Sequence, residues 1–485
     1  MKFRVVLFVL SLIGGLISTS MLLPALWAWC EGTPDAAVLF KSAAASLTVC
    51  ALAAVLVRPS RRRTERGITV REAYAIVTFS WIVASVIGAL PYVAYGTTGS
   101  FTDAFFEAMS GFTTTGASIL KDVESNPHGI LLWRALTHWL GGMGIIVLSL
   151  TVLSFIGGGM ELYKAETPTP VPEKLTPRLQ QTAVILWKIY LLLTALETAA
   201  LMLCGTTFYE GLTHAFSTLA TGGFSIYNDS IAHFQSPAIE WILIVFMFLA
   251  GVNFTLHFLF LQGHHSVYLK DDEFRWYAGI ILFAAAASTA AALAGRMNIS
   301  FSTALRHSVF QAVTLMTTTG FAVTDTLQWP YFVHFLFLTL MLIGGCAGST
   351  GGGIKVLRFM MLAQSAKNDL LQSVQPHRVL CLRLNGRAQD SSLVNSVLAF
   401  FVQFIMLLAA FTLLLTLMGI DVLSAFSGVI ACLSNTGPAL GRFGPLSNYA
   451  DVPAAGKWVL SFAMLTGRLE LTTVLMLFLP SVWRR

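Results

Sequence analysis

The sequence predicts an all-α integral membrane protein of about ten transmembrane helices, and three observations support this fold class. Of its 485 residues, 55% are hydrophobic and only 11% are charged, whereas a soluble domain averages about 25% charged residues. Apolar runs long enough to cross about 30 Å of hydrocarbon recur from end to end. Lysine and arginine collect in alternate loops, as in multi-pass proteins. We therefore expect the chain to lie in a lipid bilayer.

The apolar runs divide into two leading helices and four repeats of one plan. The leading helices are expected near residues 4–28 and 37–57. Each repeat then holds a helix, a short helix, a glycine-bearing loop and a second helix. The outer helices of the repeats are expected near 70–95 and 129–156, 182–205 and 237–262, 276–294 and 331–362, and 393–419 and 456–479. The predicted units are 1–68 for the leading pair and 69–160, 161–265, 266–391 and 392–485 for the four pore repeats.

The basic residues predict the orientation. Between two apolar runs lies a cluster of arginines that comprises Arg58, Arg61, Arg62, Arg63, Arg66 and Arg71. By the positive-inside rule this cluster should be cytoplasmic. Counting spans from this cluster places both termini in the cytoplasm. The other predicted inside segments hold Lys164, Lys174, Arg178, Lys270, Arg275, Lys355, Arg358, Lys367, Arg378, Arg383, Arg387, Arg484 and Arg485, whereas the outside loops hold scattered cations such as Lys121, Arg296 and Arg442. Because no basic stripe covers a helix face, nucleic acid is not an expected partner.

Four short strings align without gaps inside the segments between the two helices of each repeat. They are TTTGAS at 113–118, ATGGFS at 220–225, TTTGFA at 317–322 and SNTGPA at 434–439. The aligned glycines are Gly116, Gly223, Gly320 and Gly437, with Gly222 as an alternative in the second string. Each segment is too short and polar to cross the bilayer, and a re-entrant backbone needs protein or water around it. A water-filled centre surrounded by the four loops is therefore expected.

The four strings together predict a cation filter. Consecutive repeats enter the membrane in one orientation, so their loops can meet on a common axis, and inward carbonyl groups can replace the hydration shell of a cation. The expected filter residues are Thr114, Thr115, Gly116, Thr221, Gly222, Gly223, Thr318, Thr319, Gly320, Asn435, Thr436 and Gly437. The alternative for any one string is an ordinary helix C-cap in an apolar protein.

Two features break the likeness of the repeats. Glycines interrupt the second helix of the third repeat, which predicts a loop of irregular backbone that faces a cavity beneath the filter and obstructs the pore. The residues of this loop are Gly345, Cys346, Ala347, Gly348, Ser349, Thr350, Gly351, Gly352 and Gly353. Close helix packing through these glycines is the alternative. Arg468 lies at a comparable depth in the last helix, where we expect it to form an electrostatic barrier that contacts this loop. A structural ion pair with Glu470 is the alternative.

These motifs resemble those of the TrkH subunit of the Trk/Ktr/HKT potassium transporters, and the resemblance covers essentially the whole chain. It implies a pseudo-tetrameric pore selective for K⁺ and often Rb⁺, with a homodimeric assembly in the cell inner membrane. It also implies a cytoplasmic nucleotide-binding partner resembling TrkA and an intramembrane gating loop at the matching glycines. The K⁺ ion would then bind the filter carbonyls of Thr115, Gly222, Thr319 and Thr436. Plant relatives that transport sodium carry serine at the first filter glycine, where this chain has Gly116.

Competing functions remain open at this stage. A symporter coupled to H⁺ or Na⁺ is the alternative to a gated K⁺ conduit, with Glu107, Glu197, Glu240 and Glu470 in or near helices. A non-transporting receptor or membrane enzyme is a different class. The chain shows no nucleophile, base and orienter constellation and no zinc-ligand spacing, so we expect no enzyme and no cofactor besides the transported K⁺. The basic segment 355–392 is the expected docking surface for a regulator.

Overall fold

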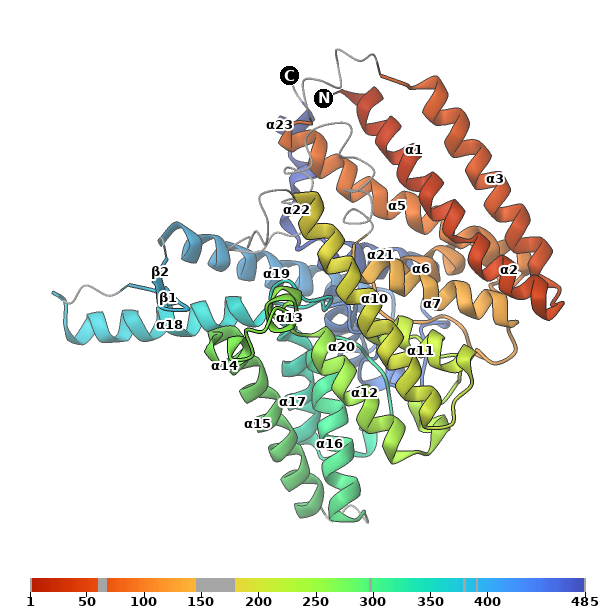
Figure 1. Cartoon of the computed structure of the whole chain (residues 1–485). Helices are drawn as coiled ribbons and strands as arrows, with labels where there is room; N and C mark the ends of the chain where they lie inside the picture. The colour runs from red at the N-terminus through yellow and green to blue at the C-terminus, as the bar shows by residue number, and fades with distance from the viewer. Residues whose placement is uncertain are drawn as a thin grey trace.

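The computed structural model describes residues 2–59, 68–144, 179–295, 299–377, 381–389 and 391–483, and it is all-helical apart from one short hairpin (Figure 1). The leading helices are α1 (Phe3–Ser20), α2 (Leu22–Glu31) and α3 (Asp35–Leu56). α1 and α2 join at Met21 into a single 29-residue apolar span. Gly32, at φ 71°, then turns the chain into α3, which packs back against α1.

The remaining elements follow the predicted order of long helix, short helix and second helix. The first repeat holds α5 (Val70–Tyr95), α6 (Phe101–Phe112) and α7 (His128–Gly142). The second holds α10 (Leu179–Leu203), α11 (Phe208–Leu219), η1 (Ser230–Phe234), α12 (Pro237–Ala250), α13 (Phe254–Leu261) and α14 (Val267–Lys270). The third holds α15 (Asp272–Ala294), α16 (Phe301–Met316), η2 (Thr326–Gln328), α17 (Tyr331–Leu342), α18 (Val356–Val374) and the antiparallel strands β1 (Arg383–Leu384) and β2 (Arg387–Ala388). The fourth holds α19 (Ser391–Leu417), α20 (Val422–Leu433), η3 (Gly441–Phe443), α21 (Ala454–Arg468), α22 (Thr472–Leu475), η4 (Met476–Phe478) and α23 (Pro480–Trp483).

The four short helices α6, α11, α16 and α20 begin in the same way. In each, the side chain before the first helical residue accepts a hydrogen bond from the backbone N–H three residues later, at 3.0–3.2 Å. These N-caps are Ser100, Thr207, Ser300 and Asp421. Because such a cap satisfies a backbone donor that the first helical turn leaves unpaired, all four short helices start at a defined residue.

The described residues contain six helices long and apolar enough to cross a membrane, or eight if each of two bent pairs is one span. Of the ten predicted spans, two are not among these eight. The first is the second helix of the first repeat, expected over 129–156: the structure has α7 as far as Gly142, and the expected range from residue 145 on lies outside the described residues. The second is the helix expected over 331–362, which stops at Leu342 and resumes at Val356, on either side of the predicted glycine-rich break.

The predictions of unbroken helices over 237–262 and 456–479 are wrong. The chain bends by 99° between α12 and α13, and by 113° between α21 and α22. At the first bend, Gly251 lies against the hydroxyl of Tyr277, and the Asn253 side chain caps the new helix by accepting from the N–H of Thr255 at 2.9 Å. At the second bend, Glu470 and Leu471 adopt positive φ angles of 51° and 56°. The break in the third repeat is therefore longer than its counterparts but is not unique.

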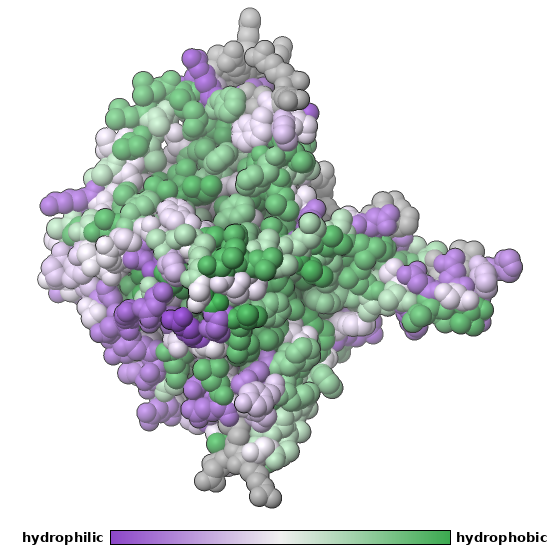
Figure 2. All heavy atoms as spheres, turned by 180° about the vertical axis from the view of Figure 1, so that it is seen from behind, coloured by the Kyte–Doolittle hydropathy of each residue, from purple (hydrophilic) through white to green (hydrophobic). Residues whose placement is uncertain are grey.

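The surface agrees with a bilayer environment. Hydrophobic residues cover most of the face shown in Figure 2, and hydrophilic residues gather along one side of the body and towards the tip of a projecting arm. Figure 1 shows that α18, the β1–β2 hairpin and the start of α19 form this arm. Several predicted topology markers lie outside the described residues: Arg61, Arg62, Arg63, Arg66, Lys164, Lys174, Arg178, Arg296, Arg378, Arg484 and Arg485.

The two ends of the described chain lie on the same side of the molecule (Figure 1). The rings of Phe3 and Trp483 stack with their centroids 6.4 Å apart. The backbone N–H of Lys2 also donates to the Glu72 carboxylate at 2.7 Å, which places the start of α5 on this side too. Since the chain leaves and regains one side between α1 and α5, an even number of crossings separates them.

Candidate functional site

All four short helices end in the same backbone turn, at the strings that the sequence predicts to be filter loops. The N–H of the residue before the aligned glycine donates to a carbonyl five residues upstream at 2.8–2.9 Å, in Thr115, Gly222, Thr319 and Thr436. The residue before that one has a left-handed conformation, with φ between 52° and 59°, in Thr114, Thr221, Thr318 and Asn435. This is the hydrogen-bonded left-handed helix cap of the alternative interpretation. The cap and the predicted filter loop are therefore one structure.

The aligned glycines have left-handed backbone conformations as well. Their φ angles are 80° at Gly116, 79° at Gly223, 82° at Gly320 and 88° at Gly437, whereas Gly222 has no positive φ. Gly223 is therefore the counterpart of the other three, and the carbonyl of Gly222 takes the place of those of the aligned threonines. Glycine adopts this conformation without the steric cost that a Cβ atom imposes.

The four loops contact one another in a closed cycle. The open side of each aligned glycine faces a carbonyl oxygen of the next loop, so close that an added Cβ atom would overlap with it. The pairs are Gly116 with Gly222, Gly223 with Thr319, Gly320 with Thr436, and Gly437 with Thr115. The four oxygens belong to the residues whose carbonyls the sequence assigns to ion coordination. Chain segments separated by hundreds of residues thus meet in one ring of neutral oxygen atoms.

Buried side chains hold the loops in place behind this ring. The Thr113 and Thr115 hydroxyl oxygens lie 2.8 Å apart, and those of Thr317 and Thr319 have the same separation. The amide of Asn435 donates to the Thr115 hydroxyl at 2.9 Å and so links the fourth loop to the first. These threonine hydroxyls are therefore engaged with one another and with the Asn435 amide.

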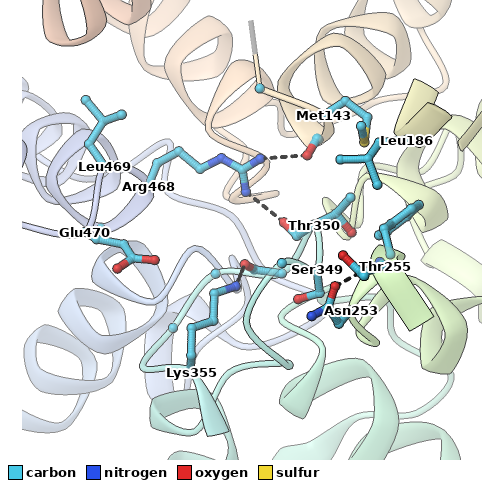
Figure 3. Close-up of a pocket in the computed structure, with 18 of the residues that line it drawn as sticks. Met143, Leu186, Asn253, Thr255, Ser349, Thr350, Lys355, Arg468, Leu469 and Glu470 are labelled. Carbon is cyan, nitrogen blue, oxygen red and sulfur yellow. Dashed lines mark hydrogen bonds between the residues drawn. The ribbon is translucent and has the colours of Figure 1, made fainter. Parts of the chain in front are cut away.

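A cavity opens on each side of the ring. The outer cavity, of about 180 Å³, is lined by the four aligned glycines and by loop residues that follow them. The inner cavity, of about 140 Å³, is lined by Gly348–Gly353, Asn253, Lys355 and Arg468 (Figure 3). On the outer loops, a hydrogen bond from Asn228 lowers the pKa of Asp122 below its usual range, so this carboxylate is ionised at neutral pH. The ring therefore lies between two cavities.

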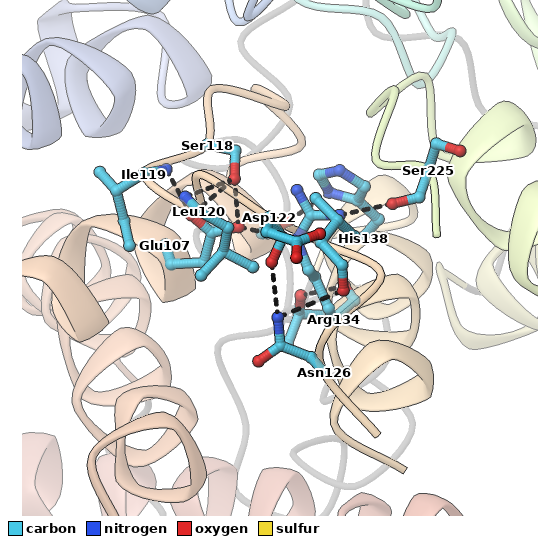
Figure 4. Close-up of polar contacts among 12 residues, drawn as sticks. Glu107, Ser118, Ile119, Leu120, Asp122, Asn126, Arg134, His138 and Ser225 are labelled. Atoms are coloured by element: carbon cyan, nitrogen blue, oxygen red, sulfur yellow. Dashed lines mark hydrogen bonds and ion pairs between the residues drawn. The ribbon is translucent and has the colours of Figure 1, made fainter. Parts of the chain in front are cut away.

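A buried ion pair that the sequence analysis did not single out braces the first two loops (Figure 4). Arg134 of α7 donates to Glu107 of α6 at 2.7 Å and to the Ser225 carbonyl at 2.8 Å. Its guanidinium also lies 3.4 Å from the ring centroid of Phe224. Glu107 accepts from the N–H of Ile119 at 2.9 Å. The sequence signal that could have revealed this pair is Arg134 itself, because an arginine inside an apolar helix usually faces a polar partner or a cavity.

Arg468 lies beneath the ring and has the predicted contact with the glycine-rich loop. Its guanidinium donates to the Thr350 carbonyl at 2.8 Å, and to the Gly141 and Gly142 carbonyls at the end of α7 at 2.6 and 3.0 Å (Figure 3). It also reaches the Thr114 hydroxyl of the first filter loop at 3.2 Å. The alternative partner, Glu470, forms an ion pair with Arg358 of α18. Arg468 thus joins the first repeat to the third.

The 345–353 loop, defined by the nine predicted residues, contacts the other repeats and the filter. Its ends meet where Ile343 pairs with Ile354 and the N–H of Gly344 donates to the Ile354 carbonyl at 2.9 Å. The N–H of Cys346 donates to the Gly251 carbonyl at the bend of the second repeat, at 2.9 Å. Gly352 donates its N–H to the Thr318 hydroxyl at 2.7 Å, and Lys355 donates to the Gly351 carbonyl. The loop therefore lies directly under the filter loops.

The chain is similar to proteins that are named potassium transporters. The family model for TrkH, described as a cation transport protein, matches residues 41–484. The Trk system potassium uptake protein TrkH of Salmonella typhimurium is 38% identical and that of Vibrio parahaemolyticus is 40% identical, and each match covers 100% of both chains. The crystal structure of the potassium transporter TrkH from Vibrio parahaemolyticus superposes with a TM-score of 0.90 at 36% identity, covering 100% of both chains. The chain therefore belongs to the TrkH family of cation transport proteins.

Proposed function

We propose that this chain is the pore-forming subunit of a potassium uptake system and conducts K⁺ through the ring of filter loops. The observation that carries the proposal is the closed cycle in which the glycine of each loop lies against a carbonyl of the next. A ring of backbone carbonyls replaces the hydration shell of a cation without a charged ligand. The relatives at 38% and 40% identity, which are named potassium uptake proteins, support K⁺ as the ion.

The pore would be a pseudo-tetramer of the four repeats 69–160, 161–265, 266–391 and 392–485 behind the leading helices. The identical N-caps, C-terminal turns and positive φ angles of the four short helices support this arrangement. The C-terminal ends of these helices meet at the ring, where their partial negative charge favours a cation. The K⁺ ligands would be the carbonyls of Thr115, Gly222, Thr319 and Thr436.

The 345–353 loop would act as a gating loop and Arg468 as an electrostatic barrier in the inner cavity. The hydrogen bonds of Arg468 to Thr350 and of Gly352 to Thr318 support these roles, because they tie the loop to Arg468 and to the third of the four loops. A cation leaving the filter would meet a fixed guanidinium in surroundings of low dielectric constant, where repulsion is stronger than in water.

The assembly would be a homodimer in the cell inner membrane, with both termini in the cytoplasm and a regulatory subunit resembling TrkA on that face. The shared Trk system name of the relatives supports a multi-component system. The adjacent ends of the described chain at Phe3 and Trp483 support an even number of crossings. The basic segment 355–392 is the proposed docking region for the regulator.

Rubidium uptake into vesicles that contain the purified chain tests the proposed function. We expect ⁸⁶Rb⁺ to accumulate down its electrochemical gradient, to be competed by K⁺, and to continue without a pH or Na⁺ gradient. A coupled symporter would need one of those gradients, so uptake that disappears when they are abolished favours the alternative. Vesicles without protein provide the background, and uptake no greater than this background would refute the proposal.

A further inference from the structure

A carboxylate that has no role in the proposed pore binds both the gating loop and the helix that follows it. Glu273 lies in the first turn of α15, and its side chain is buried. One of its oxygens accepts from the N–H of Ala347 at 2.7 Å and from the N–H of Leu357 at 3.1 Å. Ala347 belongs to the gating loop, and Leu357 belongs to the first turn of α18. One carboxylate thus joins the gating loop to the start of α18.

The two residues before Glu273 bind the tip of the β1–β2 hairpin. The Asp272 N–H donates to the side-chain oxygen of Asn385 at 2.8 Å, and the Asn385 N–H returns a bond to the Asp272 carboxylate at 2.8 Å. The Asn385 amide also donates to the Asp271 carboxylate at 2.9 Å. Asn385 and Gly386 have φ angles of 47° and 76°, as a tight hairpin turn with two left-handed residues requires. Three hydrogen bonds therefore fasten an exposed turn next to Glu273.

The base of the same hairpin packs against the gating loop. Leu382 and Leu384 are buried in a small apolar cluster with Ala347 of the loop. The rest of this cluster comes from α18 and α19 and comprises Leu357, Met360, Met361 and Val397. Ala347 thus takes part both in the hydrogen bond to Glu273 and in the apolar cluster that includes the hairpin. A displacement of the hairpin would change both contacts together.

We propose that Glu273 is a positioning residue that holds the gating loop in its obstructing place, and that hairpin 381–389 is the cytoplasmic input to this clamp. The proposal rests on the proposed pore and gate. Because its tip bonds are exposed to water, the hairpin can be displaced at lower cost than the buried elements around the filter. A cytoplasmic subunit that binds the hairpin would shift Asp271 and Asp272, and with them Glu273, without contacting the pore.

The first test is regulator-independent ⁸⁶Rb⁺ flux in vesicles. Glu273→Ala leaves two buried N–H donors without their acceptor, so we expect the basal flux to rise about tenfold. Because Glu273→Gln keeps an acceptor oxygen, its basal flux should rise less. Asn385→Ala should raise the flux in the same direction, and its effect should vanish in the Glu273→Ala background. Arg383→Ala, on the same hairpin but with its backbone bonds retained, is the matched control. The K⁺-over-Na⁺ preference should not change in any variant.

The second test reads the loop without using ion flux. Cys346 is buried beside Ala347 and can be kept as the only thiol by replacing Cys30, Cys50, Cys204, Cys381 and Cys432 with alanine. We expect a maleimide to label Cys346 about tenfold faster in Glu273→Ala and Asn385→Ala than in the single-thiol chain that keeps both Glu273 and Asn385. Wild-type flux and labelling in a monodisperse Asn385→Ala or Glu273→Ala protein, or a lower flux with an altered ion preference, would overturn the proposal. Faster labelling in a chain that conducts no K⁺ would support the clamp and refute the pore.

Discussion

Glycines and carbonyl oxygens interlock at the centre of the protein at the scale of single atoms. Each aligned glycine combines a positive φ with a neighbouring oxygen in the space that a Cβ atom would occupy. The positive φ would strain the backbone of any other residue at this position, and the nearby oxygen would collide with its Cβ atom. Gly96, at the end of α5, also has a positive φ of 85° but has no atom within 4 Å of an added Cβ. The two conditions can therefore be separated by mutation.

Substituting a filter glycine should abolish selective conduction. In Gly223→Ala the new methyl group must displace the Thr319 carbonyl, so we expect K⁺-selective flux to fall at least about a hundredfold. Gly96→Ala should leave ⁸⁶Rb⁺ uptake unchanged, with a cost of only about 1 kcal/mol in stability. Uptake measured in vesicles at matched protein density makes the comparison. Equal uptake by Gly223→Ala and the wild type would show that the loops do not conduct.

Removing the charge of Arg468 should lower the barrier to cation passage through the proposed pore. Arg468→Ala deletes the bonds to the Thr350 and Gly141 carbonyls and the positive charge below the filter, so we expect a higher basal current in planar bilayers. Arg468→Lys keeps the charge but not the forked contact, and it should give an intermediate current. An Arg468→Ala current equal to that of the wild type would contradict the barrier role.

At the scale of elements, the proposed gating loop and the proposed filter are joined by direct hydrogen bonds. The N–H of Gly352 donates to the Thr318 hydroxyl, and Arg468 reaches the Thr114 hydroxyl. Both threonines have left-handed backbones in their filter loops. If the 345–353 loop moves as proposed, the hydrogen bond from Gly352 to the Thr318 hydroxyl must break.

Thr318 offers a test of this link. Thr318→Val keeps the side-chain shape but removes the hydroxyl that accepts from the N–H of Gly352. Because this leaves a buried N–H unpaired, the loop should open more often and the open probability should rise severalfold. Thr318→Ser keeps the hydroxyl and is the control. Single-channel recordings measure the change. If the two variants gate alike, the hydrogen bond does not hold the loop.

The sequence predicted several of these elements because local chemistry determines them. The repeated strings identified the residues of the ring, and the glycine run between Gly344 and Gly353 predicted the broken helix. The bends at Gly251 and at Leu471 were missed because they depend on packing against α15 and against the neighbouring loops, which hydropathy does not report. Asn385-Gly386 is a known turn signal, but its partners Asp271 and Asp272 lie more than a hundred residues away.

At the scale of the whole molecule, ion pairs connect neighbouring repeats on the outer side of the ring. Arg306 of α16 donates to Glu240 of α12 at 2.7 Å, and Lys457 of α21 donates to Asp103 of α6 at 2.5 Å. The first pair joins the second and third repeats, and the second pair joins the fourth and the first. These pairs are largely buried, whereas the pair between Lys121 and Asp451 is exposed.

Breaking a buried pair between repeats should destabilise the assembly of the pore. Arg306→Gln leaves the Glu240 carboxylate without its main partner, so we expect a loss of about 2–4 kcal/mol and a lower Tm in detergent. Lys121→Gln, at an exposed pair, should leave the Tm nearly unchanged. Equal Tm values for both variants would mean that the buried pair does not stabilise the contact between the second and third repeats.

The central claim is that K⁺ passes through the ring of carbonyls down its own gradient. The most direct test is the reversal potential of the purified chain in planar bilayers, with independent gradients of K⁺, Na⁺ and H⁺. We expect the reversal potential to follow the K⁺ gradient alone in the wild type, and Gly320→Ser to move it towards the Na⁺ potential. A reversal potential that shifts with the pH or Na⁺ gradient in the wild type, or one that Gly320→Ser leaves on the K⁺ potential, would contradict the account.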